Sequence, residues 1–515
     1  MNEKILLLVL DGWGLSTSFA GNAIRLANAE NFDYLWNSYP HWVLNVNKIN
    51  NSNILIDSNI GSASISCGRF LPSNLDFINE TIKDQSFFSN RALNDSIDRC
   101  LSLKSSLHLI GLISDSGKFS SLNHLFALLK MAKRKGLKEV FIHAICDGID
   151  SEEKLTEVYI NKINGLTEKE GIGKIASIAG RKYCFDEETS FENILKYFRA
   201  ITSLYANQSL DVIQTIHNNR KQNRLDGEIY PTLIYENKHP IARIKDFDSL
   251  IFFNYDDKSL RSLASIFLGQ RNAIRNKEVY NVNVTTFTDY LYLAENVKLN
   301  IAFSRDDFKP NLAQVLSENN KKQLYISDIK KSASSIYSFC GQKNMLPGQT
   351  NKIINSESNY HDLTLHIFNE IIESLKNDSY DFICANMSSA DYFGHRGSIS
   401  ETENAVKNID SHLLEIEETA LQNKYNLLIT ADHGFVEQMA SRNKENTSAG
   451  NHSTNPVPFI YIKKGIEKNT YNLGLKNNLL SEILNTTSSI CDVAPTILDI
   501  LKINALNSMV GKSLL

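Results

Sequence analysis

The stretch that most limits the fold is residues 425–439, YNLLITADHGFVEQM. Its branched apolar residues 426–430 predict a buried strand, which ends in an adjacent carboxylate and imidazole, Asp432 and His433. Open α/β sheets keep their chemistry at the carboxyl ends of their strands. The stretch therefore predicts an α/β protein in which this pair is either part of a metal site or a strand end with a hydrogen-bonded core histidine.

The same arrangement recurs at two other predicted strands. Residues 4–10 form a continuous apolar run that ends at Asp11, and residues 382–386 form another that is followed by Asp391 and His395. An aspartate and a histidine four positions apart share one face if their segment is helical. Taken alone, Asp11 is explained equally well as a turn residue before glycine.

Residues 57–64, DSNIGSAS, are small and polar and accompany a short predicted helix. A serine such as Ser58 in this place is most often an N-cap. The alternative is a nucleophile whose alkoxide is stabilised by the positive end of the helix. The local sequence alone favours the cap.

The middle of the chain alternates predicted strands with helices, which indicates a parallel sheet. These strands cover residues 107–113, 139–145, 175–179 and 249–254. Other expected elements are helices at residues 23–36, 122–135 and 494–501 and strands at residues 42–46, 324–327 and 458–462. The charged run at residues 304–307 predicts a linker.

Composition narrows the class of protein. A chain of 515 residues predicts two to four domains. With a net charge of −4, the chain lacks the excess of basic residues that is typical of nucleic-acid-binding proteins. No apolar stretch is long enough to span a membrane. The 7 cysteines lack CxxC spacing, which argues against a disulfide framework. We therefore expect a reduced, cytoplasmic protein with neither nucleic acid nor membrane as a partner.

Seven residues with oxygen or imidazole donors lie at predicted strand ends or in loops of the outer segments. They are Asp11, Ser58, Asp391, His395, Asp432, His433 and His452. This mixture of donors suits two divalent cations such as Mn²⁺ or Zn²⁺. Such a pair would hold a phosphoryl group and activate a serine.

The chain resembles the cofactor-independent phosphoglycerate mutases, a branch of the alkaline phosphatase superfamily. The motifs LDGWG, IKDQSFF, IHAICDGID, ASIAGRKY, SSADYFGH, LLITADHGFVEQM, NHSTNPVPFIYI and CDVAPTILDIL follow that family in order and at its spacing. The resemblance implies an α/β fold of two domains. A metal-binding, phosphatase-like domain of residues 1–73 and 306–515 would be interrupted by an inserted α/β phosphotransferase domain of residues 74–305.

The resemblance also implies roles for individual residues. One metal ion would be held by Asp11, Ser58, Asp432 and His433, and the other by Asp391, His395 and His452. Mn²⁺ is favoured, with Zn²⁺, Co²⁺ and Mg²⁺ as alternatives. Ser58 would be the nucleophile that forms a phosphoserine intermediate.

Three further residues match substrate-handling positions of that family. Asp150 would handle a proton and bind substrate, and Arg181 would bind substrate. Lys331 would steady the phosphate, with its neighbour Lys330 as the alternative register.

The residues that grip phosphoglycerate in that family are mostly replaced here. A histidine of that family is replaced here by Phe119, and four of its arginines are replaced by Ile149, Glu187, Asp256 and Ser259. Near the nucleophile, a glutamate and a histidine of that family are replaced by Asn59 and Ser62. An arginine paired bidentately with a carboxylate is worth a few kcal/mol, and an acidic replacement adds repulsion. The replacements therefore predict weak binding of phosphoglycerate.

We expect a phosphomutase-like, dimetal phosphotransferase that acts on another small phosphate or phosphonate ester and is a monomer. One alternative is a genuine mutase of 2- and 3-phosphoglycerate whose substrate site is rebuilt from Lys118, Lys182 or Lys258. The other alternative is a catalytically silent scaffold. A complete set of metal ligands argues against it, because a site that is no longer used is not expected to keep all of them.

Overall fold

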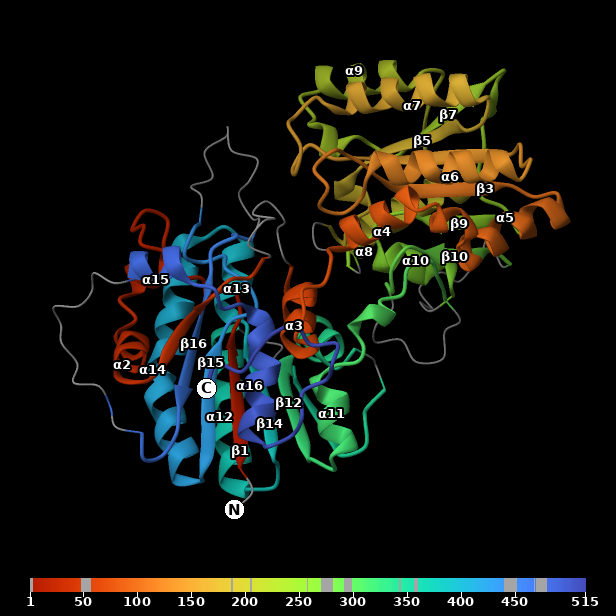
Figure 1. Cartoon of the computed structure of the whole chain (residues 1–515). Helices are drawn as coiled ribbons and strands as arrows, with labels where there is room; N and C mark the ends of the chain where they lie inside the picture. Colours follow the sequence, from red (N-terminus) through yellow and green to blue (C-terminus); the bar gives the residue numbers. More distant parts are fainter. Residues whose placement is uncertain are drawn as a thin grey trace. The chain divides into compact units, whose positions relative to one another are not determined.

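The structure is a computed structural model in which the chain divides into two compact units (Figure 1). The outer unit comprises Met1–Ser73 and Arg305–Leu515, and the inserted unit comprises Asn74–Ser304. Arg305 thus belongs to the outer unit, whereas the sequence assigned it to the inserted one. The reason is that its guanidinium pairs with Asp307 at 2.8 Å and donates to the carbonyl of Pro72 at 2.9 Å.

The structure describes residues 3–47, 57–186, 189–203, 206–256, 258–269, 281–290, 299–341, 344–355, 360–439, 452–466, 468 and 479–515. Glu187, one of the replaced positions named above, lies outside these residues.

The outer unit is built on a seven-stranded sheet in the order β13-β12-β14-β1-β15-β16-β2. The strands are β1 (Lys4–Leu10), β2 (His41–Leu44), β12 (Gln323–Asp328), β13 (Gln349–Ile354), β14 (Phe382–Met387), β15 (Tyr425–Thr430) and β16 (Val457–Ile462). The prediction of a buried parallel strand at the N-terminus is confirmed, because β1 pairs in parallel with β14 and β15 and is buried from Ile5 to Leu10. β16 is antiparallel to both of its neighbours.

The helices of the outer unit pack against this sheet and against one another. They are α1 (Ala23–Ala27), α2 (Glu30–Ser38), α3 (Ser58–Cys67), α11 (Leu312–Glu318), α12 (Tyr360–Asn377), α13 (Ser389–His395), α14 (Ile399–Gln422), α15 (Leu479–Asn485) and α16 (Val493–Ile500). The prediction of one helix over residues 23–36 is wrong. Asn28 is left-handed, with φ 51°, and caps α1, so the chain turns before α2 begins.

The inserted unit is built on a second sheet in the order β11-β10-β9-β3-β4-β5-β7-β6, with β8 paired to β7. The strands are β3 (Leu107–Ile113), β4 (Val140–Cys146), β5 (Lys174–Gly180), β6 (Asn207–Ser209), β7 (Thr232–Glu236), β8 (His239–Pro240), β9 (Ser249–Phe252), β10 (Asn283–Thr286) and β11 (Asn300–Ile301). The predicted parallel arrangement is confirmed for β9, β3, β4 and β5. Within the described residues, the antiparallel pairs of this sheet lie around β7.

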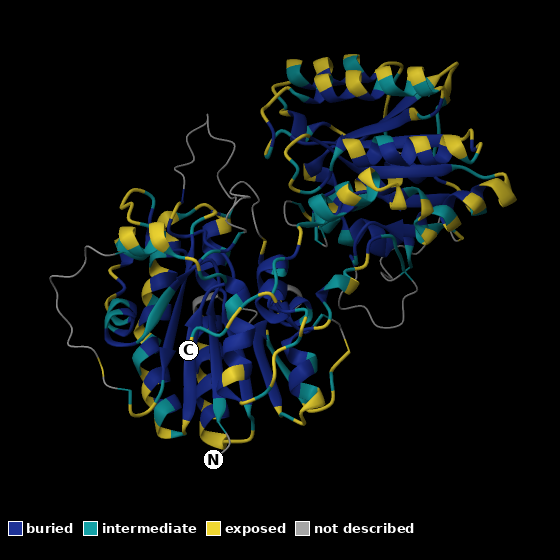
Figure 2. Cartoon of the chain, in the orientation of Figure 1, coloured by how far each residue is buried: buried dark blue, intermediate teal, exposed yellow. Residues whose placement is uncertain are grey.

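Helices in the described part of the inserted unit accompany this sheet. They are α4 (Asn74–Lys83), α5 (Arg91–Leu103), α6 (Leu122–Arg134), α7 (Thr156–Glu170), α8 (Phe191–Ser203), α9 (Val212–Lys221) and α10 (Arg261–Phe267). In both units the strands are buried, and exposed residues gather on the outward faces of helices and in loops (Figure 2). All seven cysteines are buried, and none forms a disulfide. In the part of the chain that the structure describes, no helix has the length and apolar character needed to cross a membrane.

Candidate functional site

The candidate site lies at the carboxyl ends of four neighbouring strands of the outer unit, β12, β14, β1 and β15. Asp11 follows β1, and Asp432 and His433 follow β15. Asp391 and His395 lie on α13, directly after β14, so the predicted helical spacing of this pair is confirmed. Because parallel strands bring their carboxyl ends to one edge, residues far apart in the sequence meet there.

Ser58 is the first residue of α3 and does not cap it. The cap is Asp57, whose Oδ1 accepts a hydrogen bond from the backbone N–H of Ile60 at 2.8 Å. The N-cap interpretation of Ser58 is therefore wrong, because the preceding aspartate satisfies the end of the helix. The Ser58 Oγ lies instead 2.9 Å from Nε2 of His433 and accepts a hydrogen bond from Nζ of Lys331 at 2.9 Å.

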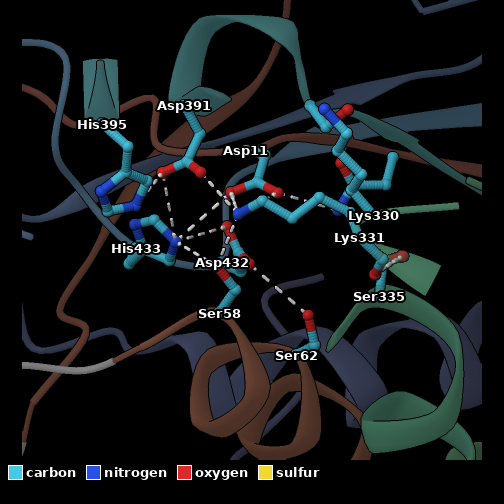
Figure 3. A network of polar contacts seen from close by, with 12 residues as sticks. Asp11, Ser58, Ser62, Lys330, Lys331, Ser335, Asp391, His395, Asp432 and His433 are labelled. Atoms are coloured by element: carbon cyan, nitrogen blue, oxygen red, sulfur yellow. Dashed lines mark hydrogen bonds and ion pairs between the residues drawn. The ribbon is translucent and has the colours of Figure 1, made fainter. Parts of the chain in front are cut away.

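A glycine allows α3 to approach the strand end closely. A Cβ added to Gly61 would lie 2.4 Å from the carbonyl oxygen of Asp432, closer than real atoms approach. One turn of helix after Ser58, the Ser62 hydroxyl points toward Asp432 and lies 3.5 Å from its Oδ2 (Figure 3). Helix α3 therefore presents two hydroxyls to the same cluster of carboxylates.

Three carboxylates form the centre of the site. Asp11, Asp391 and Asp432 are fully buried. Nε2 of His433 lies 3.3 Å from Asp11, 3.7 Å from Asp432 and 4.0 Å from Asp391 (Figure 3). The donor atoms of Asp11, Asp432 and His433 all lie within 4.8 Å of one another. This is the spacing of ligands around one cation.

The two remaining histidines lie near Oδ1 of Asp391, the same oxygen that His433 faces. The donor atoms of Asp391, His433 and His452 form a second group within 4.8 Å. Nε2 of His395 lies 3.5 Å from Oδ1 of Asp391 and 3.1 Å from Nε2 of His452. The rings of His433 and His452 stack at 3.7 Å. The structure thus brings all seven candidate ligands into one cluster, in which His433 belongs to both groups.

Lys331, rather than its neighbour, points into this cluster. Its Nζ lies 2.5 Å from Oδ2 of Asp391 and 3.2 Å from Oδ2 of Asp11. The Lys330 ammonium turns outward and donates to the hydroxyl of Tyr392 at 3.4 Å. Lys331 is therefore the lysine that the geometry places beside Ser58 (Figure 3).

The three carboxylates share their buried cluster with the ammonium of Lys331. Burial lowers the pKa of Lys331, but the carboxylates of Asp11, Asp391 and Asp432 outweigh it and hold that pKa well above its usual range. Burial, with the charge of Asp11, raises the pKa of Asp432 to about 7. Its buried Oδ1 accepts no hydrogen bond from the described residues.

Bound divalent cations would supply positive charge beside the three buried carboxylates. Burying several carboxylates together is costly unless positive charge compensates them. Carboxylate, hydroxyl and imidazole donors are also the ones that Mn²⁺ and Zn²⁺ accept. The residues present therefore fit two divalent cations.

The other predicted site residues meet at the carboxyl ends of β4 and β5 in the inserted unit. Nη1 of Arg181 lies 2.8 Å from Oδ1 of Asp147 and 2.5 Å from Oδ2 of Asp150. Nζ of Lys118 donates to the other oxygen of Asp150 at 2.9 Å. Burial raises the pKa of Asp150, but Lys118 and Arg181 outweigh burial, so that pKa is lowered.

The replaced positions surround this cluster with apolar or internally bonded groups. The Arg181 guanidinium lies 5.1 Å from the centre of the Phe119 ring. Ile149 is 54% exposed. The Asp256 carboxylate accepts hydrogen bonds from the backbone N–H groups of Lys258 at 3.0 Å and Ser259 at 2.6 Å. The Asp256 carboxylate thus bonds to the backbone of the turn that follows it.

Two of the lysines considered as substitutes for the lost arginines have carboxylate partners. Lys118 pairs with Asp150, and Lys182 pairs with Glu228 at 2.8 Å. Neither lysine supplies an uncompensated positive charge.

Reasoning from the sequence alone assigns no role to Glu437. It is fully buried, and it lies four residues after His433 inside the stretch that first suggested a site. An acidic residue directly after the apolar pair Phe435 and Val436 was the available signal.

The chain matches known proteins along its whole length. Residues 78–292 match the family described as BPG-independent PGAM N-terminus, and residues 312–449 match type I phosphodiesterase / nucleotide pyrophosphatase. The 2,3-bisphosphoglycerate-independent phosphoglycerate mutase of Clostridium tetani is 31% identical, over 100% of this chain and 99% of the relative. The enzyme of the same name from Francisella philomiragia is 30% identical over the same shares.

Among solved structures, the phosphoglycerate mutase of Leishmania mexicana shares the fold. Its TM-score is 0.77, with 18% sequence identity, and the match covers 99% of this chain and 97% of that one.

Proposed function

Because the chain belongs to the 2,3-bisphosphoglycerate-independent phosphoglycerate mutase family, we propose that it transfers a phosphoryl group through Ser58 and acts on a small ester other than phosphoglycerate. Membership makes it a metal-dependent, phosphomutase-like enzyme of the alkaline phosphatase superfamily. The ester would be a phosphate or a phosphonate.

The observation that carries the proposal is the position of the Ser58 Oγ. It lies 2.9 Å from both Nζ of Lys331 and Nε2 of His433, at the edge of the buried carboxylate cluster. An ammonium at this distance stabilises the serine alkoxide and the oxygens of a phosphoryl group beside it. This is the environment that a serine nucleophile requires.

We assign the metal ligands as the sequence suggested. Asp11, Ser58, Asp432 and His433 would hold one cation and Asp391, His395 and His452 the other, with Mn²⁺ favoured. When bound, the two cations would lower the pKa of the Ser58 hydroxyl and neutralise charge on the transferring phosphoryl group.

The transfer would proceed in two steps. In the first, the Ser58 hydroxyl gives up its proton and its oxygen forms a bond to phosphorus, while the ester bond to the leaving alcohol breaks and the alcohol takes up a proton. In the second, an acceptor hydroxyl or water gives up its proton and forms a new bond to phosphorus, while the bond to Ser58 breaks and the serine oxygen takes up a proton. We propose Asp150 as the residue that handles a proton and Arg181 as a substrate-binding residue.

The charges in the inserted unit support an ester other than phosphoglycerate. Arg181 is neutralised by Asp147 and Asp150, and Lys118 is bound to Asp150. A small, highly anionic substrate requires uncompensated cations. The exposed side chain of Ile149 would instead face a less anionic or uncharged group.

A genuine phosphoglycerate mutase is the second candidate, and the 31% identity to enzymes of that name along the whole chain favours it. The silent-scaffold hypothesis is the weakest, because all seven ligand positions, Ser58 among them, lie together. A cytoplasmic location and a monomeric state remain predictions.

The test is an assay of the Mn²⁺-loaded protein with 3-phosphoglycerate and, separately, with p-nitrophenyl phosphate. Formation of 2-phosphoglycerate and release of inorganic phosphate are followed independently. We expect phosphate release from the aryl ester and no appreciable isomerisation. Isomerisation at ordinary mutase rates would refute the substrate proposal, and inactivity on both compounds with metal bound would support the scaffold.

A further inference from the structure

Glu437 is a buried carboxylate whose two oxygens are fully used by neutral donors. Oε2 accepts hydrogen bonds from the backbone N–H groups of Gly14 at 3.1 Å and Phe435 at 2.7 Å. Oε1 accepts from the amide of Asn455 at 2.9 Å and from the hydroxyl of Ser453. Among the described residues Glu437 forms no ion pair.

These donors come from three of the segments that carry candidate ligands. Gly14 lies three residues after Asp11. Phe435 lies two residues after His433, and Ser453 directly follows His452. A single side chain therefore joins the loops of Asp11, His433 and His452.

Backbone contacts reinforce the same junction. Ser453 donates its N–H to the carbonyl of Gly434 at 2.8 Å, and Val436 donates to the carbonyl of Gly12 at 3.0 Å. The loops thus have a fixed register at the place where Glu437 binds them.

Two glycines make room for the carboxylate. A Cβ added to Gly14 would lie 2.3 Å from Cδ of Glu437, and one added to Gly434 would lie 2.8 Å from its Oε1. Neither approach is compatible with a side chain. The chain therefore has small residues at the positions where Glu437 reaches the backbone.

A buried ion is costly unless all its hydrogen-bonding capacity is used, and an apolar residue would pack there at lower cost. Groups behind metal ligands fix the orientation of those ligands and typically alter metal affinity when they are changed. Glu437 has the position and the bonding pattern of such a group.

We propose that Glu437 is a positioning residue that holds His433 and His452 in register with Asp11 and thereby sets the affinity of the site for divalent cations. The inference rests on the proposed two-cation site. Glu437 itself ligates no metal in this proposal and touches no substrate.

The test compares Mn²⁺ binding by full-length wild-type, Glu437→Gln and Glu417→Gln proteins with isothermal titration calorimetry. Glu437→Gln keeps the size but places an NH₂ group against N–H or O–H donors, so we expect binding weaker by about 10-fold or more. Glu417 is a buried carboxylate of the same unit that is bound by Tyr39 and Lys468, away from the ligand loops. Its variant should bind Mn²⁺ like the wild type.

A second variant distinguishes the effect of the position of the Glu437 carboxylate from the effect of its charge. Gly14→Ala keeps the carboxylate but pushes it from its place, so positioning predicts a similar loss of Mn²⁺ affinity. Wild-type affinity in a folded Glu437→Gln or Gly14→Ala protein would overturn the inference. Circular dichroism of the metal-free proteins shows whether each variant is folded, and if Glu437→Gln is not, Gly14→Ala decides.

The outcomes also separate the two proposals. If the wild-type protein binds no Mn²⁺, the proposed metal site fails. If the wild type binds Mn²⁺ and a folded Glu437→Gln or Gly14→Ala protein binds it equally well, only the role of Glu437 fails.

Discussion

Nζ of Lys331 donates a hydrogen bond to Oγ of Ser58 at 2.9 Å, although the two residues are 273 positions apart in the chain. Ser58 comes from the segment before the inserted unit and Lys331 from the segment after it. The contact therefore depends on both halves of the outer unit assembling around one sheet. It gives the serine a cationic neighbour, and several predictions of function depend on it.

Removing the Ser58 hydroxyl should abolish phosphoryl transfer. Ser58→Ala deletes the proposed nucleophile, so turnover of p-nitrophenyl phosphate should fall by about 10³-fold or more. Ser66→Ala is the matched control, because Ser66 lies on the same helix and its buried hydroxyl has no hydrogen-bond partner among the described residues. Wild-type turnover by Ser58→Ala would exclude this serine as the nucleophile.

Lys331 and Lys330 should differ sharply in their effect on catalysis. Lys331→Met removes the ammonium beside Ser58, and turnover should fall by about 100-fold, as when a donor to a transition-state oxygen is lost. Lys330→Met makes the same change of charge at a side chain that contacts Tyr392, and it should retain most of the activity. Steady-state kinetics with the aryl ester measures both. Equal losses would contradict the assignment to Lys331.

Arg181 should be essential for the stability of the inserted unit. Arg181→Met leaves the carboxylates of Asp147 and Asp150 without their shared cation in a buried place, which should cost about 3 kcal/mol in the free energy of unfolding. Lys182→Met removes only a surface pair with Glu228, so its unfolding curve should be close to that of the wild type. Urea denaturation followed by circular dichroism compares them. A fully stable Arg181→Met protein would show that the pair of carboxylates needs no cation.

Mild acid should destabilise the inserted unit through His124. Burial lowers the pKa of His124 from 6.5 to about 3, so the folded state holds this imidazole neutral while the unfolded state binds a proton below pH 6.5. The stability that depends on the neutral form is complete above pH 6.5 and is lost as the pH falls toward 3. Between pH 7 and 5 the loss from this residue should be about 2 kcal/mol.

The measurement is the free energy of unfolding at pH 7 and pH 5 for the wild type and for His124→Gln. Glutamine can still donate to Oδ1 of Asn79, which lies 3.1 Å from Nε2 of His124, and it does not titrate. The variant should therefore lose less stability over this interval than the wild type. Equal losses would mean that other groups account for the acid sensitivity.

Most of the strands could be predicted from the sequence because their signal is local. β1 and β3 have the predicted bounds, since a continuous apolar run shows where a fully buried strand begins and ends. The helix predicted over residues 23–36 failed because Asn28 is left-handed, a conformation that the apolar pattern does not reveal. The local sequence favours Ser58 as the cap because it does not show that the adjacent Asp57 satisfies the same helix end.

The sequence by itself determined which chemical groups stand at the ends of the strands, among them Asp11, Asp432 and His433, because a strand end is a local feature. Only the tertiary structure decided which of these groups meet. The order of β12, β14, β1 and β15 places Lys331 beside Ser58, and it leads the loops of Asp11, His433 and His452 to the single carboxylate of Glu437. The physical reason is that strand order, and with it every contact between distant segments, is set by packing of the whole sheet rather than by any short stretch of residues.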